Sequence, residues 1–203
     1  MIRLTLDTMK DIARQFLLKF NRFSSNEIDL ILYNTSIEEF RKGQFVIQEG
    51  SVCKKCYFVL KGVLRQFKTI DGVEKTSDFF LEKDPVVLYS SYMHGKPSEN
   101  SLHCMEDCVL LSGTKEQEIA MQKSNPSLEH LLYGLLADDY RKAENYITLL
   151  NGFNPEQRYL ALLETRPELL NRVPLVYIAS YIGITPESLS RIRKRIMSNT
   201  QKS

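Results

Sequence analysis

Apolar residues recur at helical spacing near the start of the chain. Between residues 9 and 23 they occupy one side of a helical pattern, which predicts an amphipathic helix. Residues 24–27, Ser-Ser-Asn-Glu, fit a capping box, in which a serine hydroxyl and a glutamate three positions later satisfy free backbone N–H groups. A second helix is therefore predicted to begin here and to include the run from Ile28 to Tyr33.

From residue 36 to about residue 114 the pattern changes to short β-branched and aromatic runs between turn-forming residues. Asp71-Gly72 is a strong signal for a two-residue hairpin turn. Strands of this length and spacing are typical of a small roll or barrel. The predicted strands include Phe45–Ile47, Tyr57–Leu60, Val63–Phe67, Val86–Tyr89 and Val109–Leu111.

One apolar stripe then follows a predicted helix of about 25 residues, which is long for a globular domain. Leu131 and Leu135 widen the stripe, whereas Asp138 and Asp139 interrupt it. We interpret this segment as a dimer helix, and the alternative is a helix that packs only within its own chain. The stripe consists of Leu128, Leu132, Leu136, Tyr140, Ala143, Ile147 and Leu150.

The most specific local pattern lies at residues 174–197, PLVYIASYIGITPESLSRIRKRIM. Ile178, Ala179 and Ile182 indicate the buried edge of a short helix. Gly183 stands where the end of that helix needs a left-handed residue. The sequence therefore predicts a helix, a tight turn and a second helix.

The second helix has two chemically different faces. Thr185-Pro186-Glu187 supplies a capping hydroxyl, a proline in the first turn and an acidic side chain. Leu189, Ile192 and Ile196 form an apolar face that can dock on the first helix, and the other face is polar and cationic. This division is what a DNA-reading helix needs. The candidate DNA-binding residues are Thr185, Glu187, Ser188, Ser190, Arg191, Lys194 and Arg195.

Chemistry suggests different roles along this face. Arginine can donate two hydrogen bonds to guanine, glutamate can accept one from cytosine, and serine can do either. We therefore assign base reading to Glu187, Ser190 and Arg191. Lys194 and Arg195 lie farther along the helix and suit phosphates, which add affinity without sequence preference. The alternative is a plain helical hairpin with a cationic, solvated face.

Charge is distributed unevenly over the 203 residues, although the net charge is only +2. Residues 155–203 contain eight basic and four acidic side chains, so this quarter is positive and the remainder is slightly negative. The asymmetry favours a nucleic-acid-binding module. Apolar runs are too short to span a membrane, and Asp7 and Asp11 interrupt the segment where a signal peptide would be apolar. We expect a cytoplasmic protein without membrane contact.

Taken together, these segments resemble the Crp–Fnr family of bacterial transcription regulators. RKGQFVIQEG (residues 41–50) and YFVLKGVLRQF (57–67) resemble its cyclic-nucleotide-binding β-roll, and ITPESLSRIR (184–193) resembles its recognition helix. The resemblance implies an α+β fold with a jelly-roll-like effector domain at 1–114, a linker and dimerisation helix at 115–152, and an all-helical DNA-binding domain at 153–203. It also implies a homodimer on an inverted-repeat operator in double-stranded DNA, with RNA polymerase as a candidate partner.

Two departures from the family pattern change this expectation. Family members that bind cyclic AMP carry a Gly-Glu pair and an arginine for the phosphate, but residues 85–102 contain Lys96 as their only cation besides His94. An anionic phosphate would be poorly held without that arginine. We therefore expect an effector other than cyclic AMP, or none. Few residues follow position 197, so no C-terminal β-hairpin wing is expected. The tentative effector pocket consists of Leu88, Tyr89, Tyr92, Asn100 and Ser101.

Four cysteines offer a different hypothesis, a redox or metal-sensing regulator that uses Cys53, Cys56, Cys104 and Cys108. Their spacing is outside that of ordinary zinc ribbons. Cys53 and Cys56 would point to opposite faces of a strand, and Cys104 and Cys108 can approach only if residues 106–107 form a turn. The favoured interpretation is four small buried residues in a reducing compartment. Scattered histidines indicate no active site, so we expect no enzyme activity, no metal and no cofactor.

Overall fold

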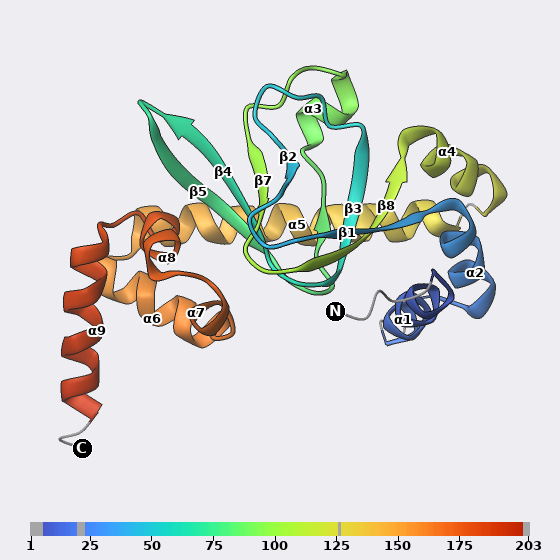
Figure 1. The fold of residues 1–203 in the computed structure, drawn as a ribbon. Helices are drawn as coiled ribbons and strands as arrows, with labels where there is room; N and C mark the ends of the chain where they lie inside the picture. The colour runs from blue at the N-terminus through green and yellow to red at the C-terminus, as the bar shows by residue number, and fades with distance from the viewer. Residues whose placement is uncertain (1–5, 20–22, 126, 201–203) are drawn as a thin grey trace.

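The computed structural model describes residues 6–19, 23–125 and 127–200, with the side chains of residues 6–9, 127–139 and 199–200 outside the description. A β-roll occupies the centre of the molecule, and helices lie at both of its ends (Figure 1). The long helix α5 (Ser127–Gly152) runs behind the roll and joins the two ends. The predicted α+β fold is therefore confirmed.

The roll consists of two antiparallel four-stranded sheets, with strand orders β1-β8-β3-β6 and β2-β7-β4-β5. Alternating side chains point between the sheets, and Val59, Leu64, Leu102 and Leu110 are fully buried there. The strands are β1 (Ser36–Phe40), β2 (Phe45–Ile47), β3 (Lys55–Lys61), β4 (Leu64–Ile70), β5 (Val73–Phe80), β6 (Pro85–Val86), β7 (Ser101–Cys104) and β8 (Cys108–Thr114).

The hairpin turn between β4 and β5 is confirmed. Asp71 and Gly72 both have positive φ, at 51° and 75°, as a two-residue hairpin turn of the mirror-image type requires.

The predicted strand Val86–Tyr89 is wrong in its second half. Strand β6 ends at Val86, and Tyr89 begins the short helix α3 (Tyr89–His94). Short apolar runs do not distinguish strand from helix, and here the chain must turn to reach β7.

The N-terminal helices cover the outer face of the first sheet. Helix α1 (Leu6–Leu18) and helix α2 (Ser25–Asn34) pack through Ala13 and Ile28 against Leu60 and Leu111 of the sheet. The predicted capping box of α2 is confirmed, because the Ser24 hydroxyl accepts from the backbone N–H of Glu27 and the Glu27 carboxylate accepts from that of Ser24. After β8, helix α4 (Lys115–Ser124) packs beside α2.

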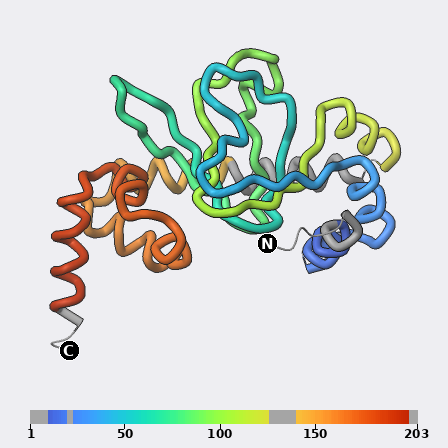
Figure 2. Tube along the Cα trace, viewed as in Figure 1, coloured from blue at the N-terminus to red at the C-terminus, as the bar shows by residue number. Residues whose placement is uncertain are grey.

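A compact helical module follows α5 at the opposite end of the roll (Figure 2). Its hydrophobic core extends into the roll, because Val63, Phe79 and Met105 pack with Tyr181 and Leu189 of the module. Within the described residues, no helix is long and apolar enough to cross a membrane. The module consists of α6 (Pro155–Thr165), α7 (Leu169–Arg172), α8 (Leu175–Tyr181) and α9 (Pro186–Thr200).

Candidate nucleic-acid interface and effector domain

Helices α8 and α9 form the predicted helix-turn-helix. Ile178, Ala179 and Ile182 are fully buried, and Leu189 of α9 is 1% exposed against them. Gly183 has φ +71°, so the turn uses the left-handed conformation that the sequence predicts for this position. The apolar side of α9 therefore faces the module, and its polar side faces outward.

The beginning of α9 shows the predicted cap. The Thr185 hydroxyl accepts from the backbone N–H of Ser188 and donates to the Ser188 hydroxyl at 3.1 Å. Hydrogen bonds from its own backbone N–H and from Thr185 lower the pKa of Glu187, so its carboxylate is ionised at neutral pH. Thr185 and Ser188 therefore hold the helix start together, and Glu187 is an exposed, charged acceptor beside them.

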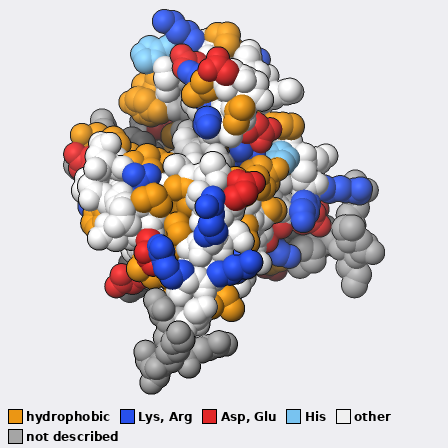
Figure 3. Space-filling model, turned by 90° about the vertical axis from the view of Figure 1, so that its left-hand side faces the viewer, with side chains coloured by type: hydrophobic (Ala, Val, Ile, Leu, Met, Phe, Trp, Pro, Cys, Tyr) orange, Lys and Arg blue, Asp and Glu red, His pale blue; other side chains and the backbone are white. Residues whose placement is uncertain are grey.

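The outward face of α9 presents exposed donors and acceptors. Glu187, Ser190, Arg191 and Lys194 are all exposed, and Arg191 Nε donates to the Glu187 carbonyl oxygen at 3.4 Å. Figure 3, which views the end of the molecule that carries α9, shows lysine and arginine side chains gathered there. The structure thus brings these four predicted residues onto one accessible face. Guanidinium, carboxylate, hydroxyl and ammonium groups are the ones that contact base edges and phosphates.

Arg195 differs from the other predicted residues because it forms an ion pair with a residue of another helix. It donates to the carboxylate of Glu156 in the first turn of α6, with Nε at 3.3 Å from Oε1. The two residues border a shallow groove of about 420 Å³ that is also lined by Asn154, Ser188 and Arg191. Glu156 therefore neutralises Arg195 at the edge of the candidate interface, which the sequence did not indicate.

The outer side of α5 carries exposed apolar residues. Tyr140 is 67% exposed, Ile147 is 58% exposed, and Ala143 between them is also exposed. Leu128, Leu132 and Leu136 of the predicted stripe lie outside the described side chains. Leu150 is half-buried, but Tyr140, Ala143 and Ile147 are open to solvent, as a surface that packs against a second copy would be in the isolated chain.

The five residues of the tentative effector pocket make different contacts. Leu88 is buried in the roll core, whereas Tyr89 is 54% exposed at the start of α3. The Tyr92 hydroxyl donates to the carboxylate of Glu118 on α4, and the Ser101 hydroxyl accepts from the backbone N–H of Glu49. Asn100 is half-buried, with its backbone N–H bonded to Ser98.

Arg65 has a different environment from the residues of the tentative effector pocket. It lies on the outer face of β4, is 1% exposed, and donates to the Thr76 hydroxyl and the Glu74 carboxylate. Its guanidinium also stacks on the ring of Tyr177 in α8. Arg65 is thus a contact between the roll and the helix-turn-helix rather than a cation of the roll interior.

Further ion pairs between the roll and the helical module were missed in the sequence analysis. Arg172 of α7 donates two hydrogen bonds to Glu82, at 2.7 and 2.8 Å, and also pairs with Glu106. Arg166 donates to the Phe79 carbonyl at 2.6 Å and pairs with Asp78. Charge patterning alone could not pair these residues, since they are far apart in the chain.

The four cysteines are free thiols and do not converge on one point. Cys53 and Cys56 donate to the carbonyls of Lys55 and Gly113 respectively. Cys104 and Cys108 flank the turn between β7 and β8, and the Cys108 thiol donates to the carbonyls of Glu106 at 3.2 Å and Val63 at 3.5 Å. Within the described residues, no group of three or more potential ligands could hold a metal ion.

Comparison with known proteins agrees with this architecture. Residues 37–125 match the family described as "Cyclic nucleotide-binding domain". The cyclic AMP receptor protein of Thermus thermophilus is 25% identical over 178 residues, which covers 85% of this chain and 82% of that protein.

Solved structures of similar fold cover most of the chain. The structure of FixK2 from Bradyrhizobium japonicum matches with a TM-score of 0.70 and 20% identity, covering 82% of this chain and 86% of that one. A structure from Eubacterium rectale assigned to the Crp/Fnr family of transcriptional regulators matches with a TM-score of 0.69 and 18% identity, covering 91% and 88%.

The fold is thus a roll of the cyclic-nucleotide-binding-domain type, followed by a long helix and a helix-turn-helix. The chain has the fold and domain order of Crp–Fnr proteins, so the resemblance seen in the sequence is confirmed. Among these similar proteins, the one from Eubacterium rectale is described as a transcriptional regulator.

Proposed function

We propose that this protein is a homodimeric, sequence-specific DNA-binding transcription regulator. The observation that carries the proposal is the two-faced helix α9, whose apolar side is buried in the helical module and whose Glu187, Ser190, Arg191 and Lys194 are exposed on the other side. A helix held this way can enter the major groove, with Glu187, Ser190 and Arg191 at base edges and Lys194 at a phosphate.

The long helix α5 supports a dimer. Helix α5 runs along the roll and exposes Tyr140, Ala143 and Ile147 on one side. Burying such a stripe against the same stripe of a second chain would create a two-fold symmetric, coiled-coil-like contact. A two-fold dimer presents two recognition helices about 34 Å apart, so its operator is an inverted repeat with half-sites one turn apart.

The roll is proposed as the effector domain, with a ligand other than a cyclic nucleotide. Arg65 lies outside the roll interior, bonded to Glu74 and Thr76. Lys96 is exposed just beyond the end of α3. Neither cation is placed to neutralise a phosphate within the roll, and a buried phosphate needs such a partner.

Selection of binding sites from a random DNA pool tests the proposal. We expect enriched sequences that contain an inverted repeat with half-site centres about 10 base pairs apart. Enrichment of a single unrepeated site would contradict the dimer, and absence of any enriched sequence would contradict sequence-specific binding. An Ile147→Asp variant should bind the repeat more weakly, while Thr148→Asp, on an exposed neighbouring position, serves as the matched control.

A further inference from the structure

Helix α5 makes its contacts from more than one side. Lys142 and Tyr146 are four residues apart, so their side chains project from the same side of the helix. Tyr140, Ala143 and Ile147 project from a different side, where they are exposed. The contacts of Lys142 and Tyr146 are therefore separate from the surface proposed for the dimer.

Tyr146 contacts the first helix of the helix-turn-helix. Its hydroxyl donates to the carbonyl oxygen of Tyr181, the last residue of α8, at 2.5 Å. The two rings also stack, with centroids 4.7 Å apart and an angle of 11° between their planes. Tyr181 is 7% exposed and meets the Phe79 ring of β5 edge-on at 5.4 Å. Tyr146 thus joins α5 to a part of the helix-turn-helix that is itself packed against the roll.

Lys142, one turn earlier in α5, contacts the turn between β5 and β6. Its ammonium group donates to Asp84 Oδ1 at 2.5 Å. Asp84 is fixed in place, because Oδ2 accepts from the backbone N–H of Leu81 at 2.9 Å and its carbonyl accepts from that of Val59 at 3.1 Å. The same Oδ2 lies 3.8 Å from Nη2 of Arg166, which ends α6. One carboxylate thus bridges α5 and the helical module.

The helical module also has its own attachment to the roll. The shared hydrophobic core and the ion pairs of α6 and α7 hold the two together. Helix α5 ends at Gly152 and α6 begins at Pro155, so a short link joins them. Lys142 and Tyr146 are therefore contacts that fix the direction of α5 relative to the packed roll and module.

We propose that Tyr146, together with Lys142, positions α5 against the helix-turn-helix and thereby sets the half-site spacing that the dimer accepts. The proposal rests on the proposed function, in which α5 forms the two-fold contact. In such a dimer α5 fixes the symmetry axis, and the contacts on its other side fix how far α9 lies from that axis. Both are positioning residues, because they act through the placement of α9.

Half-site spacing is sensitive to this placement. One additional base pair moves a half-site by about 3.4 Å and turns it by about a tenth of a turn. A firmly held pair of recognition helices can follow only if the DNA is deformed, which costs free energy. Loosening α5 lets each module adjust, so the preference for one spacing weakens. An isolated half-site needs only one module and is bound as before.

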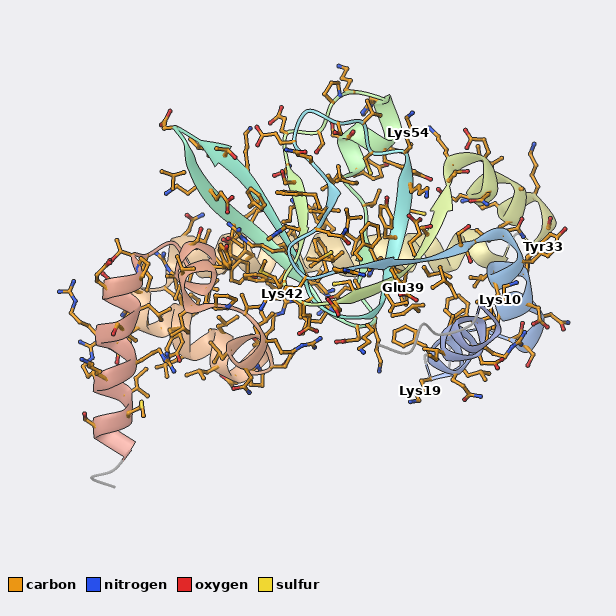
Figure 4. The ribbon with its side chains drawn as sticks, viewed as in Figure 1. Lys10, Lys19, Tyr33, Glu39, Lys42 and Lys54 are labelled. Atoms are coloured by element: carbon orange, nitrogen blue, oxygen red, sulfur yellow. The ribbon has the colours of Figure 1, made fainter. Side chains whose placement is uncertain are left out.

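The test measures affinity for inverted repeats whose half-site centres are about 9 to 12 base pairs apart, in single steps, and for one isolated half-site. The variants are Tyr146→Leu and Lys142→Gln in the full chain. Tyr33→Leu and Lys54→Gln are matched controls, because they make the same replacements at exposed positions on α2 and beside α3, away from the module (Figure 4). Residual dipolar couplings without DNA compare the orientation of α5 with that of α8 and α9.

We expect the natural protein and both controls to lose at least about fivefold in affinity when the preferred spacing changes by one base pair, the lower end of the cost of deforming DNA. Tyr146→Leu and Lys142→Gln should each at least halve this loss, with affinity for the isolated half-site unchanged. An unchanged spacing preference in either variant would overturn the proposal. Equal losses on the repeat and on the isolated half-site would also overturn it, since they would indicate damage to the module itself.

The dipolar couplings separate failure of this proposal from failure of the proposed function. If the natural protein selects no inverted repeat, the proposed function is contradicted, and the positioning role is still measured without DNA. A single alignment should describe α5, α8 and α9 in the natural protein and in both controls, and it should fail in both variants. A single alignment that also describes the variants would show that Tyr146 and Lys142 do not fix the direction of α5.

Discussion

The guanidinium of Arg65, in strand β4, lies 3.9 Å from the centre of the Tyr177 ring in α8. The Phe67 ring lies 4.3 Å from the same guanidinium, so a buried cation is stacked against aromatic rings from both the roll and the helix-turn-helix. Ser180, one turn after Tyr177, accepts from the backbone N–H of Thr76 at 3.0 Å. These contacts attach α8 directly to the sheet that carries the hairpin.

Tyr177→Ala is therefore expected to weaken the attachment of the module. The substitution removes the ring from a desolvated guanidinium, an interaction of about 1–2 kcal/mol, and exposes Arg65 to water. The free energy of unfolding from urea denaturation should fall by about this amount. Tyr177→Phe retains the ring and should behave like the natural protein, and an equal loss in both variants would contradict the stacking interaction.

The ion pair between Glu82 and Arg172 predicts a pH dependence of stability. Burial alone would raise the pKa of Glu82, but hydrogen bonds from Arg172 and from the backbone N–H of Gly62 outweigh it and lower the pKa to about 2. A carboxylate with a lowered folded-state pKa stabilises the protein above its unfolded pKa of about 4.5, and this contribution is lost as pH falls toward 2.

Glu82→Gln removes this contribution and provides the measurement. The difference in unfolding free energy between the natural protein and the variant should be largest at neutral pH and should shrink below about pH 4.5. Urea denaturation at a series of pH values gives the difference directly. A gap that stays constant down to the lowest pH at which both proteins remain folded would show that the Glu82 pKa is not lowered.

Arg191→Ala and Lys194→Ala should have different effects on DNA binding. Arg191→Ala removes a bidentate base contact, which should cost about 1–3 kcal/mol on the preferred site and relax the choice of one base in each half-site. Lys194→Ala removes a phosphate contact, which should weaken binding to all sequences alike and flatten the dependence of affinity on salt. Titrations with the selected site and with random DNA, at several salt concentrations, separate the two effects. Equal losses on both DNAs for both variants would show that the assigned roles are wrong.

Glu156→Gln is expected to strengthen binding to random DNA. The carboxylate of Glu156 now holds Arg195, and removing its charge frees the guanidinium for a phosphate. One additional phosphate contact should steepen the slope of log affinity against log salt by about 0.9. Glu164→Gln changes an exposed carboxylate on the same helix and is the matched control. If both variants gained affinity equally, the effect would be general charge reduction rather than release of Arg195.

Cyclic AMP and cyclic GMP are expected to bind no tighter than about 1 mM, or some 4 kcal/mol. The physical reason is that neither of the two candidate cations is placed to hold the phosphate, since Arg65 is committed to Glu74 and Thr76 and Lys96 is exposed. Isothermal titration with each nucleotide measures the constant. A micromolar value for either nucleotide would contradict the prediction, and Lys96→Ala would then show whether Lys96 provides the contact.

The sequence by itself determined the features that depend on short stretches of chain. The capping box at Ser24 and Glu27, the hairpin turn at Asp71-Gly72 and the left-handed Gly183 were all predictable, because a few consecutive residues decide each backbone conformation. The two faces of α9 were predictable for the same reason, since helical spacing alone separates Leu189 from Arg191.

Only the tertiary structure decided which distant residues meet. Arg172 and Glu82 are 90 positions apart, Arg195 and Glu156 are 39 apart, and nothing local in the sequence indicates either pair. Arg65 could have faced either side of its sheet, and the register of β4 with β5 and β7 turned it outward onto Tyr177. Such contacts depend on how whole elements pack, because burial of apolar faces brings the elements together and charged side chains then pair with whatever lies opposite.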